Sequence, residues 1–221
     1  IANSAKTIYS QLEFVDIAGL VKDASKGEGL GNQFLGHIRE VDAIAHVVRC
    51  FEDENITHVE GSIDPIRDLE IIETEMKLAD LESIQKRLDK KNKKNSSENE
   101  INILETALNC ISNDKNMDEI LHKNYSKKEL QQIGLLSTKP KLYVCNVDEK
   151  SISIGNKYTE SFNNKFGENN TILISAEIEN QINQLENEEK INYMKMINLK
   201  ETGLNILIKK GYGLLELETF F

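Results

Sequence analysis

Four short apolar segments along the chain are typical of β-strands. Residues 42–51 (DAIAHVVRCF), 139–149 (KPKLYVCNVDE) and 170–178 (NTILISAEI) each contain a run of apolar side chains. In 42–51 the run is continuous rather than alternating, as in a strand that is covered on both faces of a parallel sheet. Residues 11–17 (QLEFVDI) are apolar and β-branched, and they predict a further strand that reaches its end near Asp16.

A helical pattern follows the first of these strands. In residues 31–41, Phe34, Leu35 and Ile38 fall on one face of a helix. The resulting order of strand, glycine-rich loop, helix and strand favours an α/β fold with a mostly parallel sheet. Two more helices are predicted in 179–190 and 203–217.

The middle of the chain has a different, almost wholly helical pattern. Asp64 before Pro65 predicts a helix start, with the aspartate as the cap and the proline in the first turn. Two apolar stripes at spacings of three and four follow, separated by the polar run 86–100. The first stripe contains Leu69, Ile72, Met76, Ala79 and Leu88, and the second contains Ile101, Leu104, Leu108 and Ile111. This pattern predicts an antiparallel coiled-coil hairpin that interrupts the α/β sheet.

The chain therefore divides into three predicted parts. Residues 1–63 form the first part of the α/β domain, 64–139 form the inserted hairpin, and 140–221 form the second part of the domain. The first residue is Ile1, and we expect a longer polypeptide.

The amino-acid composition limits which binding partners and which cellular compartment we expect. The 221 residues carry a formal net charge of −10, which argues against a general polyanion-binding surface and against DNA as a partner. The three cysteines form no CxxC pair, so we expect ordinary thiols in a reducing compartment. No apolar run reaches about 18 residues, and we expect a cytoplasmic protein with no membrane partner.

The ends of the predicted strands carry the candidate chemistry, because ligands of open parallel sheets bind at the carboxyl ends of the strands. The first motif is DIAG, with Asp16 and Gly19. A carboxylate there can reach the water shell of Mg²⁺, and a glycine amide can approach a terminal phosphate without a Cβ in the way. The alternative is a strand-end turn with a helix cap.

The second motif is NVDE, from Asn146 to Glu149. GTP-binding domains usually have N-K-x-D here, with the aspartate reading two donors of guanine. Val147 replaces the lysine and Glu149 replaces the reading aspartate, so the preference for guanine should weaken or switch. A plain strand-end turn is the alternative.

The third motif is Ser175-Ala176-Glu177, which follows TILI. Related domains carry S-A-K at this position and offer backbone amides to the base edge. Each motif alone is weak, whereas all three in order on strand ends are far more specific.

These motifs, with DIAGLVKDASKGEGLGNQFLGHIREVDAIAHVVRCFED and VEGSIDPIRDLEIIETEMKLADL, closely resemble the Obg-like ATPase (YchF) family. That family is a Ras-like class of P-loop NTPase that prefers ATP. The resemblance implies that Asn146, Val147, Glu149 and the 175–177 segment bind the base. It also implies a second switch at Asp16 and Gly19, and Mg²⁺ held by Asp16 through water.

The resemblance also identifies what this sequence lacks. Leu20 stands where Ras-like GTPases have the glutamine that orients water, so no catalytic residue is identified and slow hydrolysis is expected. No GxxxxGK[ST] occurs; in the family the phosphate-binding loop belongs before Ile1, and the TGS domain belongs after Phe221. We expect this piece alone to bind ATP poorly and to be inactive.

Ribosome association, with the large subunit or the whole ribosome, is a further expectation from the resemblance. Basic residues at the hairpin tip could contact ribosomal RNA, although solvated helix ends also explain them. These residues are Lys86, Arg87, Lys90, Lys91, Lys93 and Lys94. Two other functions stay open: a GTPase of the Obg or DRG type, and a non-catalytic adaptor that works through its coiled coil.

Overall fold

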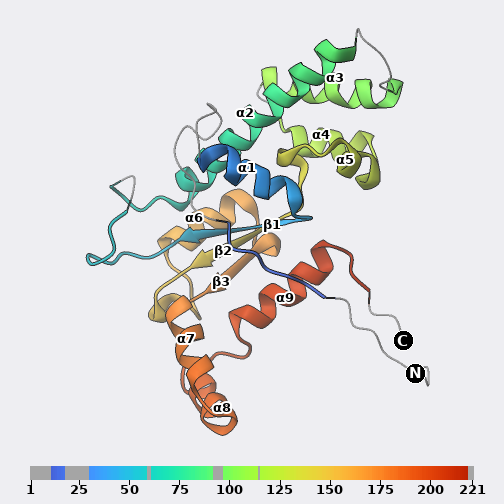
Figure 1. Cartoon of the computed structure of the whole chain (residues 1–221). Helices are drawn as coiled ribbons and strands as arrows, with labels where there is room; N and C mark the ends of the chain where they lie inside the picture. The colour runs from blue at the N-terminus through green and yellow to red at the C-terminus, as the bar shows by residue number, and fades with distance from the viewer. Residues whose placement is uncertain (1–10, 18–29, 59–60, 92–96, 114, 219–221) are drawn as a thin grey trace, which may run out of the picture. The chain divides into compact units, whose positions relative to one another are not determined.

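The computed structural model describes residues 11–17, 30–58, 61–91, 97–113 and 115–218 (Figure 1). Two compact units are present. Unit 1 contains residues 1–14, 43–69 and 140–221, and unit 2 contains residues 15–42 and 70–139. The domain boundaries predicted from the sequence, at residues 63 and 139, stay a prediction beside these two units.

A parallel sheet organises unit 1, as the sequence predicts. Strands β1 (Ile44–Arg49), β2 (Lys141–Asn146) and β3 (Thr171–Ile174) lie side by side in that order. Both pairings are parallel, with Arg49 opposite Asn146 and Asn146 opposite Ile174. The carboxyl ends of all three strands therefore lie at one edge of the sheet.

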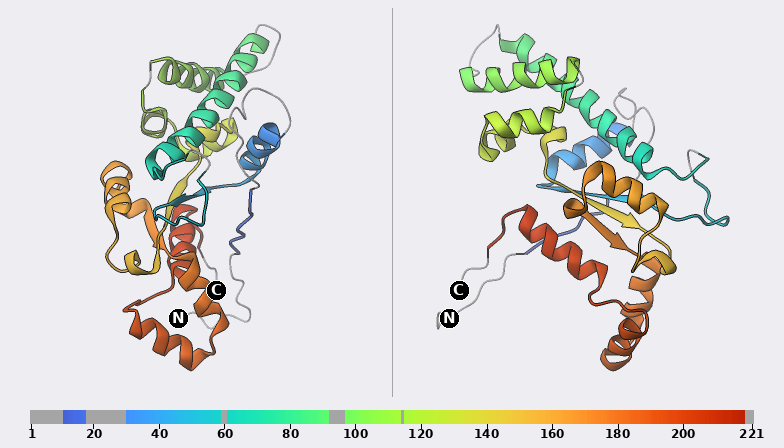
Figure 2. Two further views of the ribbon diagram at one scale, coloured as in Figure 1. Left: turned by 90° about the vertical axis from the view of Figure 1, so that its left-hand side faces the viewer. Right: turned by 180° about the vertical axis from the view of Figure 1, so that it is seen from behind.

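Helices cover both faces of this sheet. Helix α6 (Lys157–Phe166) lies on one face and α9 (Gly203–Leu214) on the other, as two views show (Figure 1, Figure 2). On the α6 face, Phe162 is fully buried with Cys145, Val48 and Leu69. On the α9 face, Gly203 lies so close to Ile174 that an added Cβ would be 2.6 Å from its Cγ1 atom.

Unit 2 contains the inserted helices. Helix α2 (Pro65–Lys91) begins in unit 1 and continues into unit 2, and α3 (Glu98–Ser112) follows it. Ile84 of α2 and Ile103 and Leu104 of α3 are fully buried in one cluster. Asp64 caps α2 as predicted, because its Oδ1 atom accepts a hydrogen bond of 3.0 Å from the Arg67 N–H.

The two helices of the predicted hairpin belong to a larger cluster of helices that share one core. Helices α4 (Met117–Asn124) and α5 (Lys127–Ile133) pack into the same core through Met117, Leu121 and Leu130. Because these helices cover a further side of α3, its buried residues include Ala107 and Cys110, which lie beside the predicted stripe. Two short helices with polar exteriors carry a weak periodic signal, so the stripes alone did not predict them.

A buried carboxylate fixes the end of this helical insertion. Asp80 of α2 is 1% exposed, and its two oxygens accept hydrogen bonds from the backbone N–H groups of Leu136 and Ser137, at 2.8 and 2.9 Å. Both donors belong to the turn η2 (Leu136–Thr138) that precedes β2. Burial raises the pKa of Asp80, and the two N–H groups oppose that rise.

Three expectations about elements were wrong. Residues 11–17 form no strand, because Phe14 and Val15 stay 50% and 60% exposed and gain no ladder partner among the described residues. β1 is not covered on both faces, because its Val47 is 68% exposed. The helix predicted at 179–190 is two helices, α7 (Ala176–Gln184) and α8 (Asn187–Met196), separated by the extended Leu185.

The remaining predicted elements are confirmed. Helix α1 (Leu30–Glu40) buries Leu35 and Ile38, as the spacing predicts. Helix α9 occupies most of 203–217. Within the described part of the chain, no helix is both long enough and apolar enough to cross a membrane.

Candidate functional site

The second and third motifs meet at the carboxyl edge of the sheet. Asn146 is the last residue of β2, and its Oδ1 atom accepts a hydrogen bond of 3.1 Å from the backbone N–H of Ala176. The next backbone amide, of Val147, donates to the carbonyl oxygen of Ile174 at 2.8 Å. The asparagine therefore braces the loop after β3 against the loop after β2.

Helix α7 starts inside the third motif. Ser175 is 1% exposed and caps the helix, with its Oγ atom accepting from the Ile178 N–H. Ala176 and Glu177 form the exposed first turn. The N–H groups of a first helical turn have no partner within the helix. Here those of Ala176 and Ile178 donate to Asn146 Oδ1 and Ser175 Oγ, and the exposed Glu177 carboxylate lies at the sheet edge.

Val147 and Glu149 point to different environments. The Val147 side chain is 2% exposed and packs in the core beneath the sheet edge. This position therefore gives a ligand only its backbone. Glu149 is exposed and begins the turn η3 (Glu149–Ser151), and its Oε1 atom accepts a hydrogen bond of 2.8 Å from the side-chain amide of Gln181 on α7.

The loop after β2 is also fixed to the end of β1. Asn156 caps α6, and its Nδ2 atom donates to the carbonyl oxygen of Cys50 at 2.7 Å and to Ser151 Oγ at 3.2 Å. Together with the bonds of Asn146 and Val147 at its start, these bonds fix the 147–156 loop at both ends. The three strand ends of unit 1 thus share one network of hydrogen bonds.

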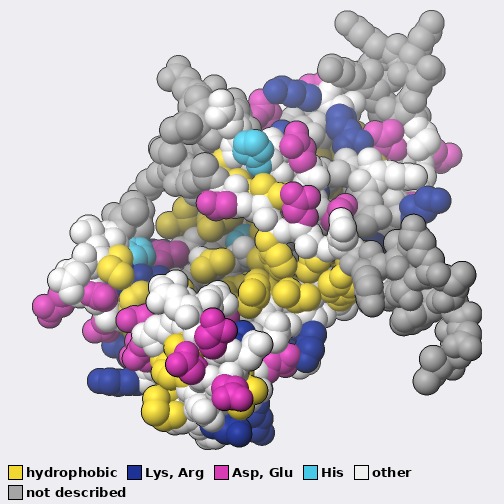
Figure 3. Space-filling model, turned by 60° about the horizontal axis from the view of Figure 1, so that its bottom comes forward, with side chains coloured by type: hydrophobic (Ala, Val, Ile, Leu, Met, Phe, Trp, Pro, Cys, Tyr) yellow, Lys and Arg dark blue, Asp and Glu magenta, His cyan; other side chains and the backbone are white. Residues whose placement is uncertain are grey.

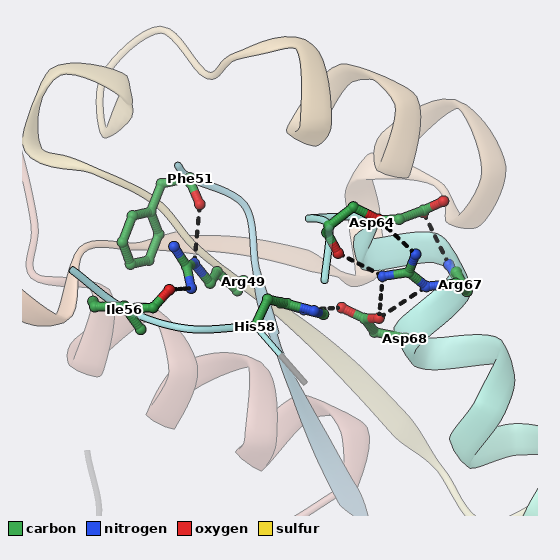
Figure 4. Close-up of polar contacts among 8 residues, drawn as sticks. Arg49, Phe51, Ile56, His58, Asp64, Arg67 and Asp68 are labelled. Atoms are coloured by element: carbon green, nitrogen blue, oxygen red, sulfur yellow. Dashed lines mark hydrogen bonds and ion pairs between the residues drawn. The ribbon is translucent and has the colours of Figure 1, made fainter. Parts of the chain in front are cut away.

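Arg49 organises the loop that follows β1 (Figure 4). Its guanidinium donates to three backbone carbonyls, those of Phe51, Asp53 and Ile56, at 3.1, 3.1 and 2.8 Å. It also lies over the Phe51 ring, 4.9 Å from the centroid. The arginine is therefore a structural brace of residues 50–56.

A second polar group lies where this loop leads into α2 (Figure 4). His58 Nε2 lies 2.9 Å from Asp68 Oδ2, and Arg67 contacts the other oxygen of Asp68 at 3.1 Å. Arg67 also donates to the hydroxyl and the carbonyl of Ser62. Because Asp68 is shared by two basic side chains, the group ties the loop to the start of α2.

The cysteines are buried thiols, as expected. Cys50, Cys110 and Cys145 are all free and buried. A hydrogen bond with Cys145, together with burial, raises the pKa of Cys50 far above its usual range. A thiol held in its protonated form is a poor nucleophile, so Cys50 contributes packing rather than chemistry.

The first motif lies in the other unit. Asp16 is exposed in unit 2, whereas Gly19, Leu20 and most of the glycine-rich loop lie outside the described residues. Convergence of Asp16 with Asn146 is therefore still a prediction. Among the described residues, no group of three or more His, Cys, Asp or Glu side chains could hold a metal ion. The single carboxylate of Asp16 offers oxygen atoms of the kind that suits Mg²⁺.

Sequence reasoning missed several residues at this edge. Arg49 and Asn156 brace the loops, and Gln181 with Tyr193 contacts Glu149 through α7 and α8. Arg49 carried a usable signal, because it ends a predicted strand at the ligand-binding edge. The pairing of Gln181 with Tyr193 carried none, since it depends on the turn between two helices.

A family model described as "50S ribosome-binding GTPase" matches residues 2–74. The whole chain is 43% identical to the ribosome-binding ATPase YchF of Bacillus subtilis and 39% identical to that of Escherichia coli O157:H7. It spans 63% and 62% of their lengths. A solved structure of the Schizosaccharomyces pombe YchF GTPase matches 90% of this chain and 57% of its own, at 34% identity and a TM-score of 0.72.

The parallel sheet, the bridged strand-end loops and these matches define an α/β protein with the fold of the P-loop NTPase class. Similarity to YchF proteins of several organisms over the whole of this chain makes the comparison more specific. Over its 221 residues the chain is similar to members of the YchF family.

Proposed function

We propose that the protein containing this chain binds and hydrolyses ATP in preference to GTP, with Mg²⁺, and associates with the ribosome. The observation that carries the proposal is the hydrogen bond from Ala176 N–H to Asn146 Oδ1, which joins two strand-end loops beside Glu149. An asparagine brace of this kind suits a base-binding loop. The relatives support the wider assignment, since their names include both ATPase and GTPase.

Glu149 is the residue that we assign to base selection. A carboxylate accepts hydrogen bonds and donates none. Guanine offers two adjacent donors on the edge that an aspartate reads, and Glu149 has one methylene more than that aspartate. The longer side chain cannot take the same position against guanine, so guanine loses its advantage.

Asp16 is the residue that we assign to Mg²⁺, through a water molecule, with Gly19 at the terminal phosphate. The ion would neutralise charge on the phosphates. Leu20 cannot polarise water, so a partner or another group must supply that function. The isolated 221-residue piece is proposed to bind Mg-ATP poorly, and micromolar affinity in isothermal titration would contradict this.

The base assignment is tested by restoring the reading aspartate of N-K-x-D with Glu149→Asp in the full-length protein. Val147 is left unchanged, because its side chain is buried and a lysine there would disrupt the core. We expect the affinity ratio of ATP to GTP to fall by about tenfold or more, which corresponds to about 1.4 kcal/mol. Isothermal titration with each nucleotide gives the ratio. A wild-type protein that prefers GTP would instead support the Obg-type GTPase, which the two GTPase names favour.

Ribosome association is proposed to use the hairpin tip. Lys86 pairs with Glu82 and Arg87 with Glu100, at 2.5 and 2.6 Å, so these two residues serve the helices themselves. Charge reversal should therefore be confined to Lys90, Lys91, Lys93 and Lys94. Loss of ribosome co-sedimentation with ATPase activity intact is the expected result, and unchanged co-sedimentation would remove the proposal.

A further inference from the structure

Glu149 lies at one end of a chain of three polar side chains. Gln181 Nε2 donates to Glu149 Oε1 at 2.8 Å, and Gln181 Oε1 accepts from the hydroxyl of Tyr193. The three residues come from η3, α7 and α8. Tyr193, on the second helix after β3, therefore influences Glu149 through Gln181, which lies on the first helix after β3.

The direction of this chain is fixed by chemistry. An ionised carboxylate can only accept, so Gln181 must present its NH₂ group to Glu149 and its oxygen to Tyr193. Burial, followed by the nearby carboxylates Glu149 and Glu177, raises the pKa of Tyr193, and its hydroxyl stays a donor at neutral pH. Hydrogen bonds in such a series polarise one another, which strengthens the hold on the carboxylate.

The charges around these three side chains show why the hydrogen bond to Glu149 matters. Helices α7 and α8 form a lobe on which acidic side chains gather (Figure 3). The acidic residues of these helices are Glu177, Glu179, Glu188 and Glu189. These four carboxylates outnumber the two lysines of the same helices, Lys190 and Lys195, so the net field would move a mobile glutamate toward solvent. A neutral amide that donates to it keeps the carboxylate at the sheet edge without neutralising its charge.

We propose that Gln181 and Tyr193 are positioning residues that set the base selectivity of Glu149, a role that rests on the proposed function. With Oε1 directed at Gln181, the other oxygen is the one that faces a ligand. One oxygen suffices for the exocyclic amine of adenine, whereas the paired donors of guanine require two acceptors side by side. The amide therefore weakens the recognition of guanine while it preserves that of adenine.

A purely structural role predicts a different outcome. If the chain only ties α7 to α8, its loss should lower thermal stability and affect ATP and GTP equally. If it positions Glu149, its loss should change the ratio of the two affinities. The ratio is therefore the readout that separates the two roles.

The experiment uses the full-length protein and titrates Mg-ATP and Mg-GTP into four variants. Gln181→Met removes the amide while keeping the side-chain length, and Tyr193→Phe removes only the outer hydroxyl. Gln184→Met is the matched control, since Gln184 is exposed on the same helix and contacts Asn180 rather than Glu149. Glu149→Gln is the reference for the base site itself.

We expect Gln181→Met to lower the ATP-over-GTP affinity ratio by about tenfold, and Tyr193→Phe to lower it less, in the same direction. Gln184→Met should leave the ratio unchanged. If Glu149→Gln changes the ratio but neither Gln181→Met nor Tyr193→Phe does, the positioning role is overturned and the base site stands. If Glu149→Gln has no effect either, both are overturned. Should Gln181→Met unfold, Tyr193→Phe decides the result.

Discussion

Asn146 Oδ1 lies 3.1 Å from the backbone nitrogen of Ala176, thirty residues further along the chain. The bond runs from the end of β2 to the first turn of α7. It joins the loop that carries Asn146-Val147-Asp148-Glu149 to the loop that carries Ser175-Ala176-Glu177. A single side chain thus determines how Glu149 and the α7 turn are presented to a ligand.

Replacing Asn146 should weaken ATP binding more than it weakens the fold. Asn146→Ala removes the acceptor of the Ala176 N–H at an exposed edge, where water can replace it. We expect about a tenfold loss of ATP affinity, since a single hydrogen bond contributes about 1 kcal/mol and the loop also loses its brace. Isothermal titration of the full-length protein measures it.

Asn180→Ala is the matched control, because Asn180 is exposed in the middle of α7. Its affinity should equal that of the wild type. Equal affinities for Asn146→Ala and the wild type would show that the brace has no part in binding.

Replacing Asp80 should destabilise the helical insertion. Asp80→Ala leaves the buried N–H groups of Leu136 and Ser137 without their acceptors. The expected loss is about 3 kcal/mol, because each unsatisfied buried group costs about 1–3 kcal/mol. Urea unfolding, followed by circular dichroism of the full-length protein, measures the change.

Two controls accompany this variant. Asp80→Asn keeps one acceptor oxygen and should lose less stability. Asp89→Ala changes an exposed aspartate of the same helix and should stay within about 0.5 kcal/mol of the wild type. A loss in Asp89→Ala as large as in Asp80→Ala would contradict the role given to the buried carboxylate.

His46 should make stability depend on pH. It is 5% exposed on β1, stacks on Tyr143, and its Nε2 atom has no hydrogen-bond partner among the described residues. Burial, followed by the charge of Lys141, lowers the pKa of His46 from 6.5 to about 4. Between these values the unfolded chain binds the proton and the folded chain does not, so stability falls as pH falls from about 7 toward 4.

The measurement compares urea unfolding at pH 7 and pH 5. His46 should account for a loss of about 2 kcal/mol over this interval. His46→Phe, which keeps a ring beside Tyr143, should remove that part of the loss, whereas His37→Phe at an exposed position should not. An identical pH dependence in His46→Phe and the wild type would rule out this origin.

The sheet was predictable because each of its strands is a short local run of apolar residues. Apolar runs marked β1, β2 and β3, and the connections between them required parallel pairing. The predicted strand at 11–17 shows the limit of the method, because propensity cannot supply a neighbouring strand for Phe14 and Val15 to pair with. Tertiary partners decide whether such a segment becomes a strand.

The helices and the site show a similar division. Helices α4 and α5 start at Asn116 and Ser126, polar caps within a polar sequence, and only the shared core with α3 reveals why they form. At the sheet edge, the order of motifs predicted Asn146 and Glu149. Ala176 was also part of a predicted motif, but its bond to Asn146 was not predicted. Gln181, the partner of Glu149, lies outside the motifs, at a position that depends on the geometry of α7.

The central claim is that the loops after β2 and β3 form one base-binding site. Photolabelling of the full-length protein with 8-azido-ATP, followed by mass spectrometry of its peptides, tests it most directly. The account predicts that the label falls in peptides containing residues 146–149 or 175–177, and that excess ATP prevents it. Specific labelling confined to the helical insertion, residues 98–138, would contradict the claim.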